Sequence, residues 1–336
     1  MFVFVATSLF AISCNKNLDQ EVSVPATSDA QLYEVSVTVD PNCVEPNVKS
    51  DINPSASEKS YTNAYILAYN KTTGALADYK SWSGSSVKFS LDKGTYTFYA
   101  VLNYGSDVTS AASSINNLLN LKATLKKDLN GFEMIGHSDI TVPATDPCTI
   151  TVKRVTAKVV MQNVKINFES QVLASSTFIL KNVFIINAVG DDSFANADNG
   201  TAYTPTVWYN QLKYVSGDCN NYLYAGGINK TIAQGATYGV NKTFYVYPNA
   251  TETDKHNGSF SARKTRIILE ATINGETCYY PLTFASIGAN KVYTVKSITI
   301  TRKGIANPDD VWDDGSGTGS VIIGDWTEGG EYDETL

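Results

Sequence analysis

Residues 87–103 read VKFSLDKGTYTFYAVLN. A short apolar run at 87–91 ends in the triplet Asp-Lys-Gly, which is typical of a turn. In the run that follows, alternate side chains share a side, because successive residues of a strand face opposite ways. The stretch therefore predicts two strands joined by a turn. The side chains that share one face of the second strand are Tyr96, Phe98, Ala100 and Leu102.

The same alternation recurs along most of the chain. Four apolar residues near the start alternate with polar ones, which predicts a strand with one buried face. Asn274-Gly275 predicts a type I′ turn between two later strands, since both central residues must take positive φ. The first strand holds Tyr33, Val35, Val37 and Val39. Further strands are expected at 65–69, 149–167, 178–186, 206–214, 242–247, 265–273, 277–284 and 292–301.

Many short strands separated by turn signals predict an all-β protein built of β-sandwiches. One segment differs, because leucines recur at helical spacing and predict a helix within residues 106–129. A chain of 336 residues is long for one ordinary β-domain and suits two. A break near residues 143–147 separates them. We expect domains at 32–148 and 149–304, followed at 305–336 by a flexible linker and a last apolar strand.

The first residues resemble a lipoprotein export signal. Residues 1–12 are apolar and are too few to span a bilayer. Ser13 then precedes Cys14, and a small residue before a cysteine is the pattern that lipoprotein signal peptidase recognises. We expect a signal peptide at 1–14, a lipid on Cys14, and a polar tether at 15–31. The usual basic region is missing, which suggests that the true start lies a few codons upstream. The alternative interpretation of the segment is a buried N-terminal strand.

The composition argues against several functions. The net charge of −7 and the absence of a basic stripe exclude nucleic acid as a partner. His137 and His256 lack motif partners, so we expect no catalytic site, no cofactor and no enzyme activity. Two weaker candidates are a calcium site in an acidic run and sugar stacking on aromatic residues. The acidic run contains Asp309, Asp310, Asp313 and Asp314, and the aromatic residues are Trp82, Trp208 and Tyr209.

The cysteines other than Cys14 show no C-x-x-C spacing, so we expect no metal site. Export makes disulfides feasible, and four cysteines allow three pairings, which the sequence leaves open. These four residues are Cys43, Cys148, Cys219 and Cys278.

Four stretches in a fixed order resemble the fimbrillin family, the subunits of Bacteroidales-type (type V) surface pili. The lipobox-like start and a terminal Val-x-Ile-x-x-Trp pattern at 321–326 add to the resemblance. The stretches are LDKGTYTFYAVLN at 91–103, VKRVTAKV at 152–159, FYVYPN at 244–249, and NKVYTV at 290–295 followed by ITI at 298–300 and Gly304.

The resemblance implies two transthyretin-like sandwiches in tandem and assembly by strand exchange. A lipidated precursor would reach the outer membrane, and a trypsin-like protease would cut after the first strand. That strand would leave, and the groove would accept the C-terminal strand of another subunit. The family usually has arginine at the cut, whereas the first arginine here is Arg154, and Lys49-Ser50 is the nearest equivalent. The implied donor strand holds Val321, Ile322, Ile323 and Trp326.

The physical chemistry agrees with this function. Removal of the first strand would bare apolar side chains, each worth roughly 1.5–3 kcal/mol when buried, and would unpair the backbone of its neighbours. A donated strand repairs both faults, and such head-to-tail contacts produce filaments. We therefore predict a structural pilus subunit at the outer membrane and cell surface, with other pilin subunits as partners. The alternative is a tip or anchor subunit, or a monomeric adhesin that binds a host glycan or protein.

Overall fold

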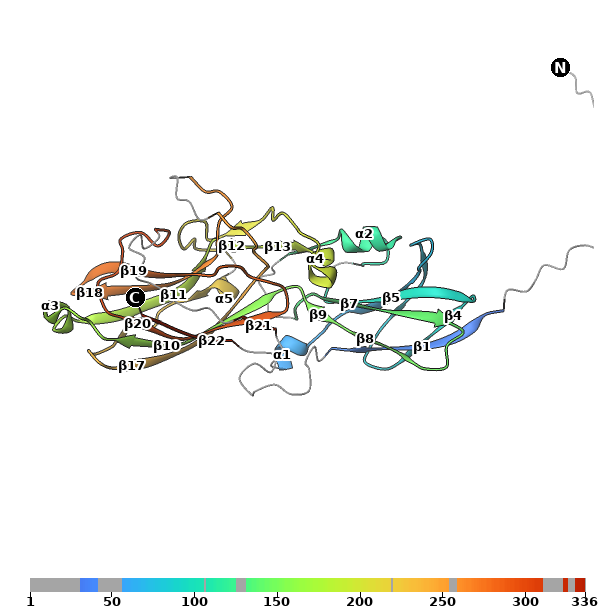
Figure 1. The fold of residues 1–336 in the computed structure, drawn as a ribbon, viewed down its shortest axis with the longest axis horizontal. Coiled ribbons are helices and arrows are strands. Elements are labelled where there is room, and N and C mark those ends of the chain that lie inside the picture. Colours follow the sequence, from blue (N-terminus) through green and yellow to red (C-terminus); the bar gives the residue numbers. More distant parts are fainter. Residues whose placement is uncertain are drawn as a thin grey trace, which may run out of the picture. The chain divides into compact units, whose positions relative to one another are not determined.

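The structure is a computed structural model, and its strands dominate the chain (Figure 1). It describes residues 31–41, 56–105, 107–124, 131–218, 220–253, 259–310, 323–325 and 330–335. Every element named below belongs to one compact unit, Leu32–Leu336. No helix among these residues is long and apolar enough to cross a membrane.

Two sheets form from the first half of the chain. A five-stranded sheet has the order β3-β2-β5-β7-β9, and a three-stranded sheet has the order β4-β1-β8. Apolar side chains from both sheets form one buried cluster, which includes Val37, Phe89 and Phe98. The strands are β1 (Tyr33–Asp40), β2 (Ala64–Asn70), β3 (Leu76–Ser81), β4 (Val87–Leu91), β5 (Gly94–Leu102), β7 (Met134–Val142), β8 (Cys148–Thr151) and β9 (Lys153–Arg154).

Two further sheets enclose the largest core. One has the order β17-β10-β20-β21 with β22 also on β20, and the other has the order β15-β11-β18-β19 with β16 on β11. The strands are β10 (Ala157–Ile166), β11 (Phe178–Ile186), β15 (Tyr224–Ala225), β16 (Lys230–Thr231), β17 (Thr237–Val246), β18 (Arg266–Ile273), β19 (Glu276–Thr283), β20 (Lys291–Ile300), β21 (Ile323–Asp325) and β22 (Gly330–Thr335).

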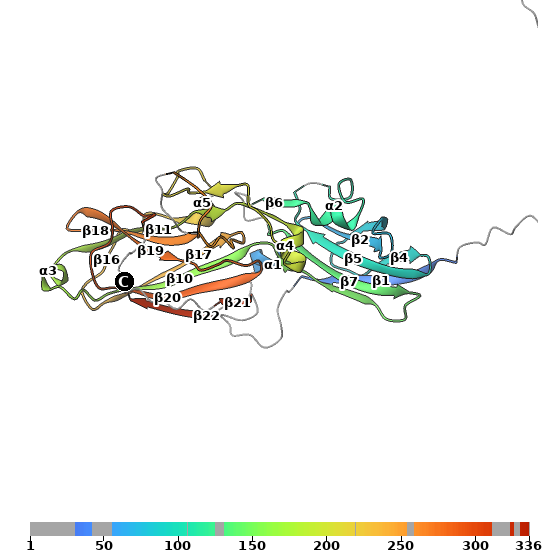
Figure 2. The same ribbon diagram turned by 45° about the horizontal axis from the view of Figure 1, so that its top comes forward.

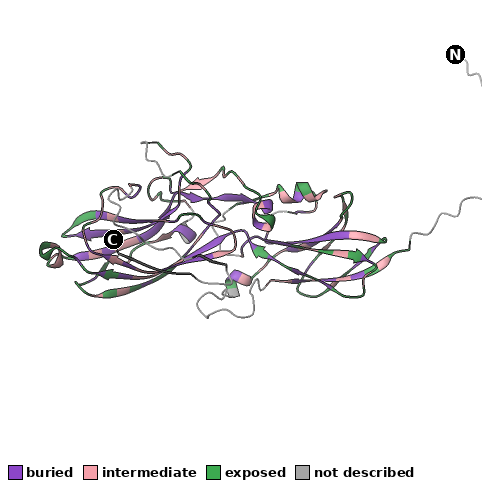
Figure 3. Cartoon of the chain, viewed as in Figure 1, coloured by how far each residue is buried: buried purple, intermediate pink, exposed green. Residues whose placement is uncertain are grey.

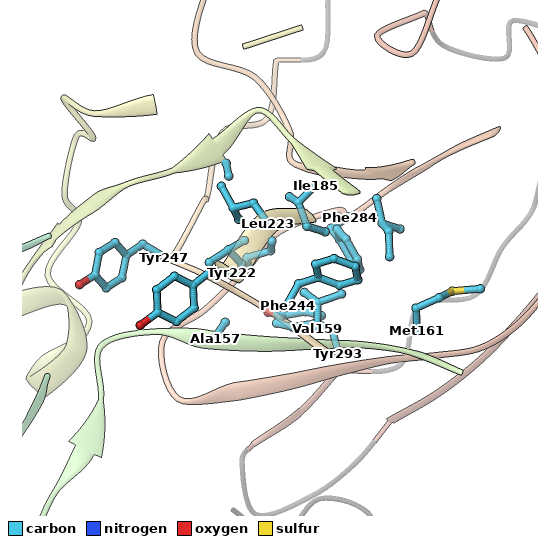
Figure 4. Close-up of a cluster of buried hydrophobic side chains, with 14 of the residues drawn as sticks. Ala157, Val159, Met161, Ile185, Tyr222, Leu223, Phe244, Tyr247, Phe284 and Tyr293 are labelled. Atoms are coloured by element: carbon cyan, nitrogen blue, oxygen red, sulfur yellow. The ribbon is translucent and has the colours of Figure 1, made fainter. Parts of the chain in front are cut away.

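The buried face of each of these sheets contributes to that core (Figure 3). Val159 of β10, Phe244 of β17 and Ile185 of β11 lie among its side chains (Figure 4). Phe284 and Tyr293 meet edge to face, with ring centroids 5.7 Å apart. Such close packing of large side chains fixes the positions of the strands to which they belong.

The remaining elements are short. Helices α2 and α4 lie close together beside β6 (Figure 2). Strand β6 pairs with β13, and β12 pairs with β14. Their bounds are α1 (Ala56–Lys59), α2 (Ile115–Leu119), α3 (Gln171–Ala174), α4 (Phe194–Asn199), α5 (Asn220–Leu223), β6 (Lys122–Thr124), β12 (Ala188–Val189), β13 (Asp191–Ser193) and β14 (Trp208–Tyr209).

The all-β prediction is confirmed, and most predicted strands match observed strands within a few residues. The expected turn is also present, because Asn274 and Gly275 have φ of 51° and 88°. The helix predicted over 106–129 is wrong except for α2. Ser114 caps α2 by accepting a hydrogen bond from the amide of Asn117, and β6 follows within the predicted helix.

The strand predicted over 206–214 is also wrong, since only β14 forms there. The Asp191 carboxylate accepts hydrogen bonds from the amides of Thr206 and Val207, each across 2.9 Å, so these amides do not pair with another strand. Asn210 then turns the backbone with φ of 47°, a left-handed conformation that a strand cannot contain.

The structure contradicts the predicted flexible linker at residues 305–310. Ile305 forms a bridge with Tyr279 of β19, with hydrogen bonds of 2.8 and 3.0 Å in the two directions. Asp309 is almost completely buried. Residues 305–310 therefore belong to the folded unit, which the acidic composition of the segment did not indicate.

The pairing of β8 bears on the expected domain boundary. Strand β8 begins at Cys148 and pairs with β1, and Ile150 packs in the same cluster as β1. Residues 148–151 therefore lie with the first-half strands. The division of the chain into two domains stays a prediction.

Candidate functional site

The candidate site is the groove that holds β1. This strand runs antiparallel to β4 on one side and parallel to β8 on the other. Val37 lies opposite Val87 of β4 and opposite Cys148 of β8. Strand β1 therefore lies between two strands, with β4 pairing along Tyr33–Val37 and β8 along Val37–Asp40.

One face of β1 supplies the core. Val35, Val37 and Val39 are buried, while Ser36 and Thr38 between them are partly exposed. The exposed face carries polar contacts, and Lys88 Nζ lies 2.7 Å from Glu34 Oε1. Such an exposed ion pair contributes little to stability. The strand is thus retained by buried valines, each worth roughly 1.5–3 kcal/mol, and by its backbone pairing.

Strand β1 comes before every other element that the structure describes. The described chain stops at residue 41 and resumes at α1. Tyr33, Val35, Val37 and Val39 form the predicted strand. The predicted lipidation residue Cys14 and the predicted cut at Lys49-Ser50 lie outside the described residues.

The chain that resumes after this gap is fixed by a buried carboxylate. Glu58 of α1 is almost completely buried, and its Oε1 lies 2.9 Å from Lys158 Nζ. Tyr245 donates a hydrogen bond from its hydroxyl to the same oxygen across 2.7 Å. Burial and the Glu58 carboxylate raise the pKa of Tyr245 well above its usual value, so this hydroxyl stays a donor at physiological pH.

Arg154, the first arginine of the chain, is fully buried on β9. Its Nε and Nη2 donate to the main-chain oxygen of Glu58 across 3.0 and 2.9 Å. A protease must reach the peptide bond beside its target residue, and this arginine is enclosed by the fold. Arg154 is therefore unsuited to the cut that the family resemblance implies.

The predicted donor strand is partly described. Strand β21 pairs antiparallel with the start of β20, and β22 pairs with β20 in parallel from Tyr293 to Thr299. Both lie on an edge of the chain's own sheet (Figure 1). Ile323 is the first residue of β21. The other residues of the predicted donor, Val321, Ile322 and Trp326, lie outside the described residues.

His137 is paired with a buried carboxylate. His137 of β7 has its Nδ1 2.7 Å from Asp198 Oδ1 of α4, and this hydrogen bond raises the pKa of His137. Tyr99 Oη lies 3.4 Å from the other oxygen of Asp198. His137 therefore has a structural partner in Asp198. His256 lies outside the described residues.

The calcium candidate is contradicted at Asp309. Arg263 Nη1 lies 2.5 Å from its Oδ2, and Arg266 Nη1 lies 2.7 Å from its Oδ1. Both oxygens of Asp309 are thus paired with guanidinium groups, so this carboxylate is unsuited to bind a cation. Asp313 and Asp314 lie outside the described residues. Within the part of the chain that the structure describes, no group of three or more His, Cys, Asp or Glu side chains could hold a metal ion.

Two cysteines are described, and both are free and buried. Cys148 belongs to β8 beside β1, whereas Cys278 belongs to β19 in the other core. Burial raises the pKa of each thiol, which lowers its reactivity. Cys43 and Cys219 lie outside the described residues.

The aromatic candidates for sugar stacking do not form one platform. Trp82 is buried and packs on Tyr61, with ring centroids 4.9 Å apart. Trp208 packs against Phe260 with ring centroids 5.4 Å apart. Gly190 leaves room for the Tyr209 ring, because a Cβ there would lie 2.3 Å from it. Trp82 is therefore a core residue, and Trp208 and Tyr209 are partly buried against the largest core.

Sequence reasoning missed Glu58 and Asp198, and it gave Asp309 a different role. Each has its partners many residues away, as Tyr245 is 187 positions from Glu58. No local pattern marks such a residue. The only available signal is an acidic side chain next to residues expected to be buried, and many exposed acids share that feature.

The fold can be compared with known proteins. No protein-family model and no curated protein sequence matches the chain. It is similar to a candidate cell adhesion protein from Bacteroides eggerthii, with a TM-score of 0.61 and 15% identity over 91% of this chain and 98% of that one. A candidate cell adhesion protein from Parabacteroides distasonis has a TM-score of 0.56 and 14% identity over 89% of this chain and 98% of that one.

A fimbrilin from Porphyromonas gingivalis is also similar, with a TM-score of 0.53 and 15% identity over 90% of this chain and 96% of that one. At these identities the likeness shows the fold alone. The chain has the all-β fold found in a fimbrilin, and the resemblance in the sequence is confirmed at that level.

Proposed function

We propose that the chain is a structural subunit of a cell-surface pilus that assembles by strand exchange. The precursor is exported, lipidated on Cys14 and held at the outer membrane. A protease cuts it in the loop after β1, at Lys49-Ser50, and β1 leaves its groove. The C-terminal strand of another subunit then fills the groove, and repetition of this step builds the filament.

The observation that carries the proposal is the position of β1. The strand is central in its sheet and buried on one face, yet it precedes all other described elements. A single cut between β1 and α1 frees it without dividing the rest of the chain. The groove left behind has apolar walls and two unpaired strand edges, so it requires a replacement strand.

The replacement strand comes from outside the groove's own chain. Each subunit would insert its C-terminal strand into the groove of one neighbour and accept the C-terminal strand of another. Such a heterologous contact does not close on itself and extends into a filament. The fold shared with a fimbrilin and with candidate cell adhesion proteins supports this assignment.

Limited proteolysis tests the proposal. Purified precursor treated with mild trypsin should lose β1 and form ladders that resist SDS, because exchanged strands are buried in their acceptors. A variant without residues 316–336 should be cut at the same rate and remain monomeric. Full-length protein that loses β1 and stays monomeric would contradict polymerisation, and a truncated variant that still forms ladders would contradict the C-terminal donor.

A tip or anchor subunit, or a monomeric adhesin for a host glycan or protein, is the second candidate function. It is favoured by the pairing of β21 and β22 with β20 of the same chain. In that function the C-terminal segment stays on its own sheet. The expected result is then a protein that stays monomeric after the cut and melts earlier without residues 316–336, because two paired strands have gone.

A further inference from the structure

Four side chains from different elements meet around the start of the chain that a cut would retain. We name them the Glu58 cluster: Glu58 of α1, Arg154 of β9, Lys158 of β10 and Tyr245 of β17. The ammonium of Lys158 and the hydroxyl of Tyr245 bind the carboxylate, and the guanidinium of Arg154 binds the carbonyl of the same residue. The cluster therefore holds both the side chain and the backbone of one helical residue.

The cluster is buried, which makes it costly to open. Glu58 is 1% exposed and Arg154 is 0% exposed. When one partner of a buried charge pair is lost, the remaining charge has neither water nor a counter-ion. Tyr245 also packs on Phe132, with ring centroids 4.6 Å apart, so its hydroxyl is directed by a fixed ring. Helix α1 is thus attached to the sheet of β10 and β17.

A second anchor lies just beyond the helix. The Asn103 side chain donates from Nδ2 to the main-chain oxygen of Ser60 across 2.9 Å and accepts from the amide of Thr62 across 2.9 Å. Asn103 itself is buried and has φ of 62°. The backbone on both sides of Lys59 is therefore held by buried groups.

Lys59 lies between the two anchored residues, Glu58 and Ser60. It is the last residue of α1, and its side chain is half-buried, so a trypsin-like protease could reach its charge. Proteases cut where the backbone can leave the fold, and they spare a segment fixed by buried contacts. Lys49 is the preceding lysine in the sequence.

We propose that Glu58 is a positioning residue that sets the downstream limit of the maturation cut. The Glu58 cluster protects the Lys59–Ser60 bond, so the mature chain begins upstream of α1 and keeps that helix on the sheet when β1 leaves. This inference rests on the proposed function, because it concerns the cut that frees β1.

The test uses variants that leave the cleavage sequence unchanged. Lys158→Met removes the ammonium, and Tyr245→Phe removes only the hydroxyl while its ring keeps packing on Phe132. The matched controls are Lys165→Met on β10 and Tyr238→Phe on β17, neither of which touches Glu58. Each full-length precursor is treated with mild trypsin, and mass spectrometry of its fragments gives separate rates at Lys49 and Lys59.

We expect wild type and controls to be cut at Lys49 and to yield a core that begins at Ser50. In Lys158→Met, the rate at Lys59 should rise at least about tenfold, which corresponds to about 1.4 kcal/mol of lost protection, and the core should then begin at Ser60. The rate at Lys49 should not change. If Lys158→Met does not fold, Tyr245→Phe decides the question with the same readout.

Equal cutting at Lys59 and Lys49 in wild type would overturn the inference. A folded cluster variant whose Lys59 stays as protected as in its control would overturn it as well. The proposed function fails in a different way, when β1 stays bound or no ladder forms after the cut. The cutting rate at Lys59 is measured separately from the departure of β1 and from the formation of ladders.

Discussion

Val37 of β1 lies directly opposite Cys148 of β8 in a parallel pair, and both side chains are buried in one cluster. A thiol therefore sits beside the strand that we propose to be removable. Strand β8 belongs with β1 although 107 residues lie between Asp40, the last residue of β1, and Cys148, the first residue of β8. A parallel pair requires such a long connection, so neighbouring residues give no signal of the pairing.

The core face of β1 should carry most of its contribution to stability. Val37→Ala removes two methyl groups from a fully buried site, and we expect the precursor to lose about 2 kcal/mol of unfolding free energy. Thr38→Ala, on the other face of the strand, should change it by less than about 0.5 kcal/mol. Chemical denaturation measures both. Equal losses in the two variants would contradict the assignment of β1 to the core.

The ion cluster at Asp309 should contribute strongly to the stability of the folded unit. Asp309→Asn leaves Arg263 and Arg266 without their shared counter-charge in a buried site, and we expect a loss of about 3–5 kcal/mol. The neighbouring change Asp310→Asn is the control, since that side chain is only half-buried. The comparison is made by denaturant unfolding. If the two variants proved equally stable, residues 305–310 would not be anchored as described.

The contact between His137 and Asp198 should make stability depend on pH. The hydrogen bond to Asp198 raises the pKa of His137, against burial and Lys153, which lower it, while Asp139 adds to the rise. Protonation is thus more favourable in the folded state. This stabilisation is fully present below the unfolded pKa near 6.5 and is lost as pH rises through the higher folded value.

The measurement is the difference in thermal midpoint between wild type and His137→Gln across this pH range. Wild type should exceed the variant at pH 5.5, and the difference should shrink as the solution becomes alkaline. A difference that grows with pH would show that the neutral histidine is the preferred form. Because the imidazole is 41% exposed, the effect should be modest.

Local patterns predicted the strands in which apolar and polar residues alternate regularly. Val35, Val37 and Val39 are separated by polar residues, and Asn274-Gly275 supplies two positive φ angles, so neighbouring residues contain the required information. The helical spacing of leucines failed because Leu118 lies in α2 whereas Leu121 follows its end, and Leu125 and Leu129 lie outside the described residues. Helical spacing over so short a segment is weak evidence when capping residues end the helix within two turns.

Contacts between distant residues could not be predicted. Asp309 occurs in an acidic run that suggests a solvated linker, and only the fold brings Arg263 and Arg266 to it. The same holds for Glu58 and Arg154, which are 96 positions apart. In both cases the decisive property is burial of a charge with its partner, and that property belongs to the tertiary structure.

The departure of β1 is tested most directly by the reactivity of Cys148. In intact precursor this thiol and Cys278 are both buried and should react slowly with a maleimide. Labelling is followed site by site with mass spectrometry, which separates them from the other cysteines. Cys278 is the internal control, since it lies in the other core.

After the loop is cut, Cys148 should react at least about tenfold faster, because the strand beside it has gone and the thiol meets solvent. Cys278 should stay unchanged. A synthetic peptide spanning residues 319–336 should restore the slow rate at Cys148 by filling the groove. If Cys148 stayed as protected as Cys278 after the cut, β1 would not leave, and the account of this chain as a strand-exchanging subunit would be contradicted.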